Sequence, residues 1–352
     1  MVTKIGINGF GRIGRMCLRA ALRNPAVKVV AINSTSDIAS SARLIKYDSV
    51  HGILGNRVEV KNNEILIDGQ SITVFSDRNP ANLAWGRLGV DIVIEATGSF
   101  KSGKDCEIYL QNGAKKVIIS APAKDSVPTI VMGVNEGIYR PEIDHVVSNA
   151  SCTTNCLAPV VKVLHECFGV SGGLMSTVHA FTSDQRSIDN RHSDPRRSRS
   201  CVQSIIPTST GAAKAIGLVM PELKGKFNGV SLRVPVIDVS LVDLVVDLQR
   251  DVSVEEINET LRIAANTTMK GIIEYCNEPL VSVDFIGNDN SAIIDGLSTM
   301  VIGKRTAKIL AWYDNEWGYS CRMIDLAKYM GDLLHVGSII GSGDIYRFRP
   351  AG

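Results

Sequence analysis

A cysteine set among hydroxyl and amide side chains is the feature of this sequence best suited to covalent chemistry. Cys152 lies in the segment Ser148-Asn149-Ala150-Ser151-Cys152-Thr153-Thr154-Asn155-Cys156, and an apolar helical pattern follows at residues 155–168. The free N–H groups and positive dipole end of a helix start lower a thiol pKa and can hold an oxyanion. We therefore predict that Cys152 is a nucleophile. The alternative is a small buried residue, which is what we expect of Cys156.

The candidate base is a histidine in an apolar strand pattern. His179 lies within Thr177-Val178-His179-Ala180-Phe181-Thr182, in a strand predicted at residues 173–181. A histidine beside a cysteine can take its proton, form an ion pair with the thiolate and act as general base for hydride loss. A hydrogen-bonded core histidine is the other interpretation of His179.

The beginning of the chain reads as a dinucleotide-binding unit. A strand at residues 4–8 leads into Gly9-Phe10-Gly11-Arg12-Ile13-Gly14 and a helix through Leu22, and a second strand follows at residues 27–33. Such glycines permit a tight turn, close approach to a pyrophosphate and close helix packing, with the anion on the helix start. This strand, GxGxxG, helix, strand order predicts a parallel sheet that binds a dinucleotide.

Two later segments end apolar strands at the edge where open α/β sheets bind ligands. Thr97-Gly98 follows a strand predicted at residues 91–96, and Ser120 ends a strand predicted at residues 116–120. We expect both segments to line the dinucleotide site. The alternative for Thr97 and Ser120 is loop capping.

The end of the second strand bears on which cofactor is preferred. A carboxylate there would bond the adenosine ribose of NAD and repel the 2′-phosphate of NADP. This chain instead has Asn33-Ser34-Thr35-Ser36-Asp37. Because a neutral hydroxyl can donate to a phosphate without charge repulsion, we predict that NADP is accepted.

Composition is typical of a globular protein with two domains. The chain has 352 residues, 45% of them hydrophobic, and a net charge of +2. This balance predicts neither a nucleic-acid coat nor an acidic partner, and no apolar run approaches the ~18 residues of a membrane span. Met1-Val2-Thr3-Lys4 enters a strand without an apolar signal segment, so we expect a cytoplasmic protein. Eight cysteines without CxxC pairs favour reduced thiols and no metal site.

The second half of the chain has a different strand and helix pattern from the first half, and it contains several arginines. Long alternating strands at residues 173–181, 229–236 and 240–249, with helices at 211–219 and 254–265, predict an α+β domain with a mixed or antiparallel sheet. The segment from Asp189 to Ser200 is rich in arginine and serine. RNA binding is one interpretation of that segment, but it lacks interleaved aromatics, so a folded interface or anion-binding loop is the better one. Arginine forks and the hydroxyl-rich helix start Pro207-Thr208-Ser209-Thr210-Gly211 indicate phosphorylated substrates.

The chain resembles phosphorylating glyceraldehyde-3-phosphate dehydrogenase along nearly its whole length. The resemblance implies oxidation of an aldehyde with capture of inorganic phosphate, Cys152 attacking the aldehyde and His179 accepting a proton. It also implies a homotetramer in which the arginine-bearing loop reaches a neighbour's cofactor. The matching motifs are residues 7–15, Lys46-Tyr47-Asp48-Ser49-Val50-His51-Gly52, residues 148–156, Thr182-Ser183-Asp184-Gln185-Arg186, residues 207–214 and Trp312-Tyr313-Asp314-Asn315-Glu316-Trp317-Gly318-Tyr319.

The same resemblance implies roles for individual residues. Those expected at the substrate phosphate are Thr182, Asp184, Arg197 and Arg233, and those at the attacking phosphate are Ser151, Thr153, Thr210 and Gly211. Those expected at the NAD or NADP cofactor are Gly9, Gly11, Arg12, Ile13, Gly14, Ser34, Arg78, Thr97, Gly98, Ser120, Arg191, Asn315 and Tyr319.

The resemblance also divides the chain and leaves questions open. It implies a nucleotide domain over residues 1–151, completed by a helix at about 315–333, and a catalytic domain over 152–314. We expect disorder in the tail at 334–352. NAD-specific members carry Asp at Ser34 and usually Leu-Pro at Asn190-Arg191, so both departures favour NADP. Erythrose-4-phosphate dehydrogenase, or a nucleotide-binding scaffold with RNA or protein contacts, remains the alternative function, and glycolytic or gluconeogenic direction is open.

Overall fold

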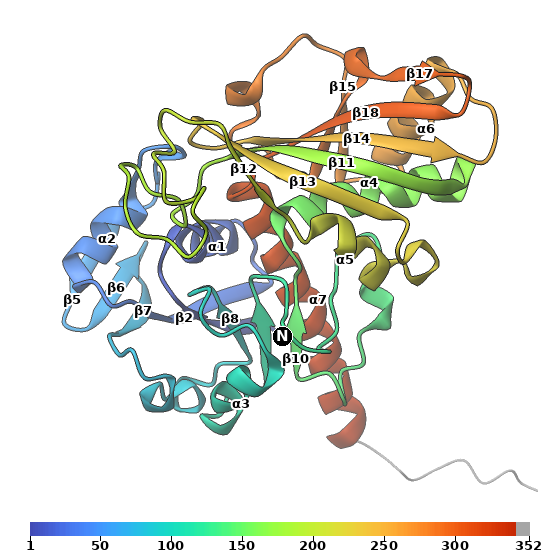
Figure 1. Cartoon of the computed structure of the whole chain (residues 1–352). Coiled ribbons are helices and arrows are strands. Elements are labelled where there is room, and N and C mark those ends of the chain that lie inside the picture. The colour runs from blue at the N-terminus through green and yellow to red at the C-terminus, as the bar shows by residue number, and fades with distance from the viewer. Residues whose placement is uncertain (343–352) are drawn as a thin grey trace, which may run out of the picture.

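Two large sheets, each covered by helices, make up the protein (Figure 1). The structure is a computed structural model, and it describes residues 1–342. The predicted fold class is confirmed, since a mostly parallel Rossmann-type sheet is joined to a mixed sheet with helices of its own. Both sheets are buried on at least one face, and each has its own apolar core.

The first sheet has the strand order β10-β9-β8-β1-β2-β7-β6-β5. Strands from β10 through β7 run parallel, while β6 pairs antiparallel with both β5 and β7. Chain order reverses at β1, which lies between β8 and β2, and a ligand crevice is expected there at the carboxyl ends of the strands. The strands are β1 (Thr3–Asn8), β2 (Val27–Asn33), β5 (Val58–Lys61), β6 (Glu64–Ile67), β7 (Gln70–Phe75), β8 (Ile92–Glu95), β9 (Lys116–Ile119) and β10 (Val146–Ser148).

Helices from both ends of the sequence cover this sheet. The last helix, α7, packs against α1 and β1, and Met323, Leu326 and Met330 are fully buried there. Figure 1 shows α7, drawn in red, beside the blue N-terminal elements. The helices are α1 (Arg12–Leu22), α2 (Ile38–Lys46), α3 (Gly103–Gln111) and α7 (Trp317–Ser342), and a small ribbon is formed by β3 (Tyr47–Asp48) and β4 (Gly52–Ile53).

The last helix is longer than the sequence analysis predicted. Helix α7 continues through Ser342, so the expectation of disorder from residue 334 is wrong for residues 334–342. The physical reason is that no proline lies between Trp317 and Ser342 and that Leu334 and Val336 continue the apolar content of the helix. The rest of that expectation, for residues 343–352, lies outside the described residues.

The second sheet has the order β12-β13-β11-β14-β18-β16-β15, with β17 paired to β18. It is mixed, because β11 runs parallel to β13 and β15 parallel to β16, and its other pairs are antiparallel. The strands are β11 (Val170–Ala180), β12 (Ile206–Ser209), β13 (Phe227–Val234), β14 (Ser240–Leu248), β15 (Ile273–Cys276), β16 (Ala292–Asp295), β17 (Met300–Ile302) and β18 (Thr306–Tyr313). Its helices are α4 (Cys152–Phe168), α5 (Ala212–Val219) and α6 (Val254–Asn266).

Gly14 is required for the close approach of α1 to the turn after β1. A Cβ at Gly14 would lie 2.1 Å from the carbonyl oxygen of Gly9, whereas a Cβ at Gly11 would meet nothing within 4 Å. We expect Gly14→Ala to lower the free energy of unfolding by about 1–3 kcal/mol through overpacking, and Gly11→Ala to change it little. Urea denaturation of both variants measures this, and equal stabilities would contradict the packing argument.

Candidate active site

Cys152 is the first residue of helix α4. The helix begins earlier than the sequence pattern suggested, because the Ser151 hydroxyl caps it by accepting the Thr154 N–H at 3.1 Å. The cap places Cys152 where the helix amides are unpaired, as the chemistry of a thiolate requires. Cys156, one turn on, is fully buried in the core as expected.

His179 reaches Cys152 from β11. The distance from Cys152 Sγ to His179 Nε2 is 3.4 Å. Nδ1 of the ring lies 2.6 Å from the carbonyl oxygen of Ala180, and Nη1 of Arg233 contacts the same nitrogen. In the tautomer with its proton on Nδ1, donated to the Ala180 carbonyl, the neutral ring presents the lone pair of Nε2 to the thiol, which is the arrangement of a general base and its nucleophile.

Burial and one nearby cation set the charge state of this pair. Burial raises the pKa of the Cys152 thiol, while Arg233 and the amides at the start of α4 act in the opposite direction. Burial, followed by the positive charge of Arg233, lowers the pKa of His179 to about 3. The imidazole is therefore neutral at ordinary pH and available to accept a proton.

Three of the residues expected at the substrate phosphate are held near the pair or near one another. Arg233 Nη1 contacts the His179 ring and donates to the Ala180 carbonyl oxygen at 3.1 Å. Arg197 donates to Asp184 at 2.6 Å and to the Thr208 hydroxyl at 2.9 Å. These contacts hold two guanidinium groups in fixed positions, as recognition of a phosphate requires.

The remaining phosphate candidates occupy loop and helix starts. The Thr182 hydroxyl donates to Gln185 at 3.3 Å, and the Thr210 hydroxyl accepts the Ala212 N–H at 3.2 Å beside Gly211, which precedes α5. The Thr153 side chain differs from the expectation, because it is buried and bonds the Tyr313 hydroxyl at 2.8 Å. The Thr153 hydroxyl is therefore engaged by Tyr313 in this structure.

Tyr313 is a site residue to which the sequence analysis gave no role. Its hydroxyl bonds both Thr153 and Thr177, and its ring meets the His179 ring edge-on at 5.9 Å between centroids. It therefore braces the histidine and the start of α4 together. Its place in the motif at residues 312–319 was the only available signal.

A cavity of about 580 Å³ lies at the carboxyl ends of β1, β2 and β8, where the strand order reverses. Of the predicted cofactor residues, it is lined by Gly9, Gly11, Ser34, Arg78 and Thr97. The position of Gly11, with open space where a Cβ would stand, leaves the backbone accessible to a pyrophosphate. The residues present therefore fit a dinucleotide.

Beneath this cavity lies a buried carboxylate that the sequence analysis missed. Glu95 accepts hydrogen bonds from Asn8 and Tyr109, each at 2.7 Å, and from the Thr97 N–H, also at 2.7 Å. Burial raises the pKa of Glu95. The Thr97 hydroxyl is engaged by Glu95 as well, so loop capping, the alternative interpretation of Thr97, is present alongside its place in the cavity wall.

The other predicted cofactor residues lie on several elements and are not part of this cavity wall. Arg12, Ile13 and Gly14 form the first turn of α1, and Gly98 follows Thr97 with φ +72°. The Asn315 Oδ1 accepts a 2.6 Å bond from Ser240, and the Tyr319 hydroxyl donates to the Ala150 carbonyl at 3.0 Å. Ser120 directly follows β9, and its N–H bonds the Glu95 carbonyl at 3.0 Å.

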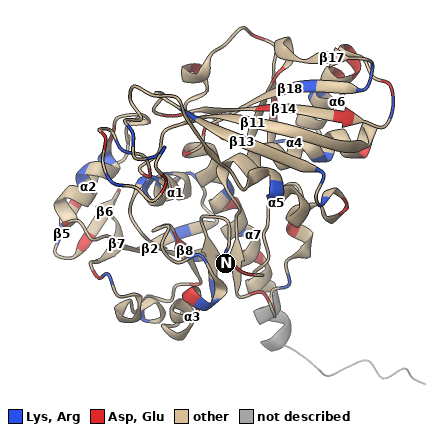
Figure 2. Ribbon diagram, in the orientation of Figure 1, with Lys and Arg blue, Asp and Glu red and all other residues tan. Residues whose placement is uncertain are grey.

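Arg191 does not line the cavity that contains Ser34. It is exposed and lines a separate hollow together with Asn190, Arg186 and Arg199. The loop carries acids as well as bases, since Arg199 pairs with Asp189 at 2.8 Å. Figure 2 likewise shows Lys and Arg interspersed with Asp and Glu along the ribbon. Among residues 1–342, no helix has the length and apolar character needed to cross a membrane.

Two family models match this sequence, one in each half of the chain. The model of the glyceraldehyde 3-phosphate dehydrogenase NAD binding domain matches residues 3–103, and the model of the C-terminal domain of the same enzymes matches residues 151–315. This chain belongs to the glyceraldehyde-3-phosphate dehydrogenase family. It is 57% identical over 330 residues to glyceraldehyde-3-phosphate dehydrogenase of Geobacillus stearothermophilus, covering 94% of this chain and 98% of that protein.

Two further relatives have the same name. Glyceraldehyde-3-phosphate dehydrogenase 2 of Bacillus subtilis is 54% identical over 94% of this chain and 97% of its own. Glyceraldehyde-3-phosphate dehydrogenase 2 of Streptomyces avermitilis is 51% identical over 95% of this chain and 100% of its own. The chain is therefore an oxidoreductase of the glyceraldehyde-3-phosphate dehydrogenase family with an NAD-binding domain, and the erythrose-4-phosphate and scaffold alternatives are not favoured.

Proposed function

We propose that this protein oxidises D-glyceraldehyde 3-phosphate to 1,3-bisphosphoglycerate with inorganic phosphate and reduction of NAD or NADP. The observation that carries the proposal is the 3.4 Å approach of Cys152 Sγ to His179 Nε2 at the capped start of α4. Two held guanidinium groups, those of Arg197 and Arg233, supply the charge that a phosphorylated aldehyde needs nearby.

The reaction proceeds through two covalent states on Cys152. As the thiol proton passes to His179 Nε2, the sulfur attacks the aldehyde carbon, and His179 returns the proton to the carbonyl oxygen to give a hemithioacetal. His179 Nε2 then accepts the hydroxyl proton while the C–H bond gives up its hydride, which leaves a thioester. The bound nicotinamide ring supplies the hydride acceptor. A phosphate oxygen attacks the thioester carbon, the C–S bond breaks, and the thiolate is regenerated.

The start of α4 serves the charged states of this sequence. Its unpaired amides, with Ser151 as cap, face the position where an oxyanion would form beside Cys152. Arg233, in contact with the His179 ring, and Arg197, paired with Asp184, provide the cations for the substrate phosphate. Thr182 is assigned to the same phosphate, and Thr153, Thr210 and Gly211 to the attacking one.

NADP is accepted as well as NAD. Ser34 lies in the cavity wall with Asp77 and Arg78, and its hydroxyl bonds Ser41 at 2.9 Å, so the end of β2 presents a neutral hydroxyl and not a carboxylate at position 34. Arg191, on the exposed arginine loop, reaches the cofactor of a neighbouring subunit in a homotetramer. The role follows from the family resemblance and from the absence of Arg191 from this chain's own cavity wall.

A carboxylate at Ser34 should reverse this tolerance. We expect Ser34→Asp to reduce kcat/KM for NADP by roughly 10- to 100-fold, because a charge-assisted bond worth about 1.5–3 kcal/mol is replaced by repulsion. Its kcat/KM for NAD should fall no more than about two-fold, since the ribose hydroxyls can donate to a carboxylate. Steady-state rates with both cofactors measure this, and Ser34→Ala controls for loss of the hydroxyl. An unchanged NADP value in Ser34→Asp would show that Ser34 does not face the 2′-phosphate.

The same proposed function implies how the chain divides into domains and where the protein works. Residues 1–151 with α7 form the cofactor domain, and residues 152–314 form the catalytic domain, the two sheets supporting this division. The protein works in the cytoplasm, in glycolysis or in the reverse direction of gluconeogenesis.

The direct test of the proposed function is the initial rate of nicotinamide reduction with glyceraldehyde 3-phosphate. The assay compares NAD with NADP, each with and without inorganic phosphate. Multiple turnovers that require phosphate are expected. Activity that does not depend on phosphate, or that appears only with erythrose 4-phosphate, would contradict the proposal.

A further inference from the structure

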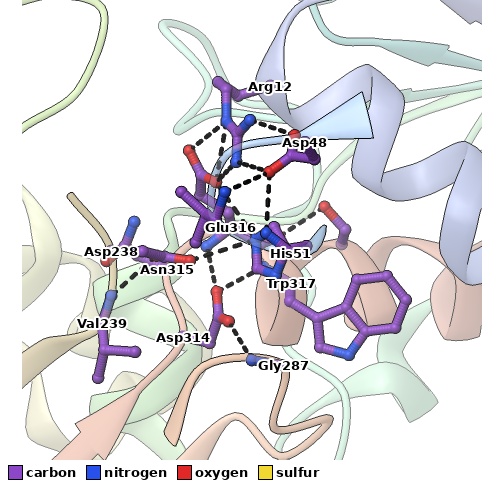
Figure 3. Close-up of polar contacts among 12 residues, drawn as sticks. Arg12, Asp48, His51, Asp238, Val239, Gly287, Asp314, Asn315, Glu316 and Trp317 are labelled. Carbon is purple, nitrogen blue, oxygen red and sulfur yellow. Dashed lines mark hydrogen bonds and ion pairs between the residues drawn. The ribbon is translucent and has the colours of Figure 1, made fainter. Parts of the chain in front are cut away.

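A buried group of charged side chains joins the start of α1 to both sheets (Figure 3). Arg12 donates through Nε to both oxygens of Glu316, at 2.8 and 3.0 Å, and contacts Asp48 through its other nitrogens. Asp48 also accepts the N–H groups of Val50 and His51 at 2.9 Å each. The motif at residues 46–52 thus contacts the start of α1, which is assigned to the pyrophosphate. No residue of this motif takes part in the reaction steps described above.

His51 connects two segments that come from different parts of the chain. Its Nε2 lies 3.2 Å from Asp238 Oδ2 and 3.4 Å from Glu316 Oε2. The His51 side chain is 5% exposed and that of Asp238 is 0% exposed. Asp238 belongs to the turn between β13 and β14, while His51 follows β3. The contact therefore ties the mixed sheet to the nucleotide-binding half.

Both partners of His51 lie close in sequence to residues that hold Asn315. Glu316 follows Asn315 in the chain, and Asp238 lies two residues before Ser240, which bonds Asn315. The Ser240 hydroxyl accepts the Ala180 N–H at 3.1 Å and donates to Asn315 Oδ1 at 2.6 Å. Because Oδ1 accepts this proton, the amide nitrogen of Asn315 is the group presented to a carbonyl acceptor.

We propose that His51 is a positioning residue for the nicotinamide, holding Asp238 and Glu316 so that the Asn315 amide is aimed at the carboxamide of the cofactor. The proposal rests on the proposed function, which assigns Asn315 to that carboxamide. His51 itself touches neither substrate nor cofactor. Its effect passes through the two segments that flank Asn315.

A proton on His51 suits this role. Burial lowers its pKa, but the carboxylates of Asp238 and Glu316, which lie 3.2 and 3.4 Å from Nε2, outweigh burial and raise the pKa to about 9. Since this value is above that of a free histidine, the ion pairs are intact at neutral pH and are lost as the pH rises through about 9. Burial and the charge of Asp238 raise the pKa of Asp314 to about 7. Three carboxylates act on the His51 ring, those of Asp238, Asp314 and Glu316. Arg12 pairs with Glu316 and with Asp48, Asp48 accepts the His51 N–H, and Arg19 donates to the His51 carbonyl oxygen.

A metal ion would fit this cluster less well than a proton. One atom each of His51, Asp238 and Glu316 lie within 4.8 Å of one another, which is a separation that metal ligands show. Arg12 already donates to both carboxylate oxygens of Glu316. A divalent cation at this place would therefore be repelled by the Arg12 guanidinium. A protonated imidazole pairs with the same carboxylates and adds only one positive charge.

The test compares two ligands on His51→Gln and the wild-type enzyme by titration calorimetry. NAD carries the carboxamide, and ADP-ribose lacks the nicotinamide ring. We expect the Kd of NAD to rise about 10-fold or more in the variant, as for loss of a charged hydrogen bond, and the Kd of ADP-ribose to change less than about two-fold. His145→Gln, at an exposed histidine, is the matched control and should bind both ligands normally.

A second readout follows the proton. In the wild-type enzyme the Kd of NAD should rise between about pH 8 and pH 10, and in His51→Gln this rise should be absent. Asp238→Asn, which keeps the shape of the side chain, should weaken NAD binding selectively as well and so tests the proposal if His51→Gln does not fold.

Three results would overturn the proposal. These are equal weakening of NAD and ADP-ribose, unchanged binding of both, and a stoichiometric metal ion at His51 in the purified enzyme. The outcome is separate from that of the proposed function, because ligand affinities are measured without turnover. Wild-type enzyme that binds NAD but shows no phosphate-dependent oxidation would instead refute the assigned reaction.

Discussion

Replacement of Cys152 by serine should reduce phosphate-dependent oxidation of glyceraldehyde 3-phosphate by roughly 10⁴-fold or more. A serine hydroxyl occupies nearly the same space at the start of α4, so folding should be retained. It ionises far less readily than a thiol, however, and forms an ester that phosphate cleaves more slowly. The change is therefore expected in kcat, with Kd of the cofactor nearly unaffected.

Cys156→Ser is the matched control for this substitution. Cys156 lies on the same helix, and its thiol contacts the Ala311 carbonyl at 3.8 Å in the core of the second sheet. The control can lose stability because it buries a hydroxyl, but it should turn over at close to the wild-type rate. Normal turnover in Cys152→Ser would rule out the covalent mechanism.

The second large effect is expected for His179→Asn, whose rate should fall roughly 10²–10⁴-fold. Burial and Arg233 lower the pKa of His179 to about 3, so the wild-type ring is neutral across the usual assay range. The variant thus loses a proton acceptor and no positive charge. Hydroxide must replace the imidazole, and the residual rate should rise with pH more steeply than the wild-type rate.

His165 provides the comparison for His179. Its Nδ1 accepts the Val170 N–H at 3.0 Å at the far end of α4, which is a structural role. We expect His165→Asn to cost stability while leaving kcat within about two-fold. A residual rate in His179→Asn with the same pH dependence as the wild type would argue against general base catalysis by this ring.

Local patterns predicted most elements of the fold and several positions in the site. The GxGxxG turn was placed correctly between β1 and α1, because Gly9 adopts a φ of 94° and Gly14 packs against the Gly9 carbonyl oxygen, and both demands are local. The strand at Val27–Asn33 also has the bounds that its β-branched pattern indicated. The start of α4 was missed by one turn, because the capping strength of Ser151 was not weighed against the apolar periodicity that begins later.

Contacts between distant segments could not be predicted from patterns. Nothing in the sequence places the Tyr313 hydroxyl against Thr153 and Thr177, because that contact depends on how β18 and β11 lie beside α4. The pairing of His51 with Asp238 across the two halves has the same origin. Residue types can suggest a nucleophile and a base, whereas the distance between them is set by tertiary packing.

The thioester at Cys152 is tested most directly by the intact mass of the enzyme after mixing with glyceraldehyde 3-phosphate and NAD in the absence of phosphate. We expect a mass increase of one 3-phosphoglyceroyl group, located on the peptide that contains Cys152 and discharged when phosphate is added. No adduct while NADH forms, or an adduct on another residue, would contradict the thioester at Cys152.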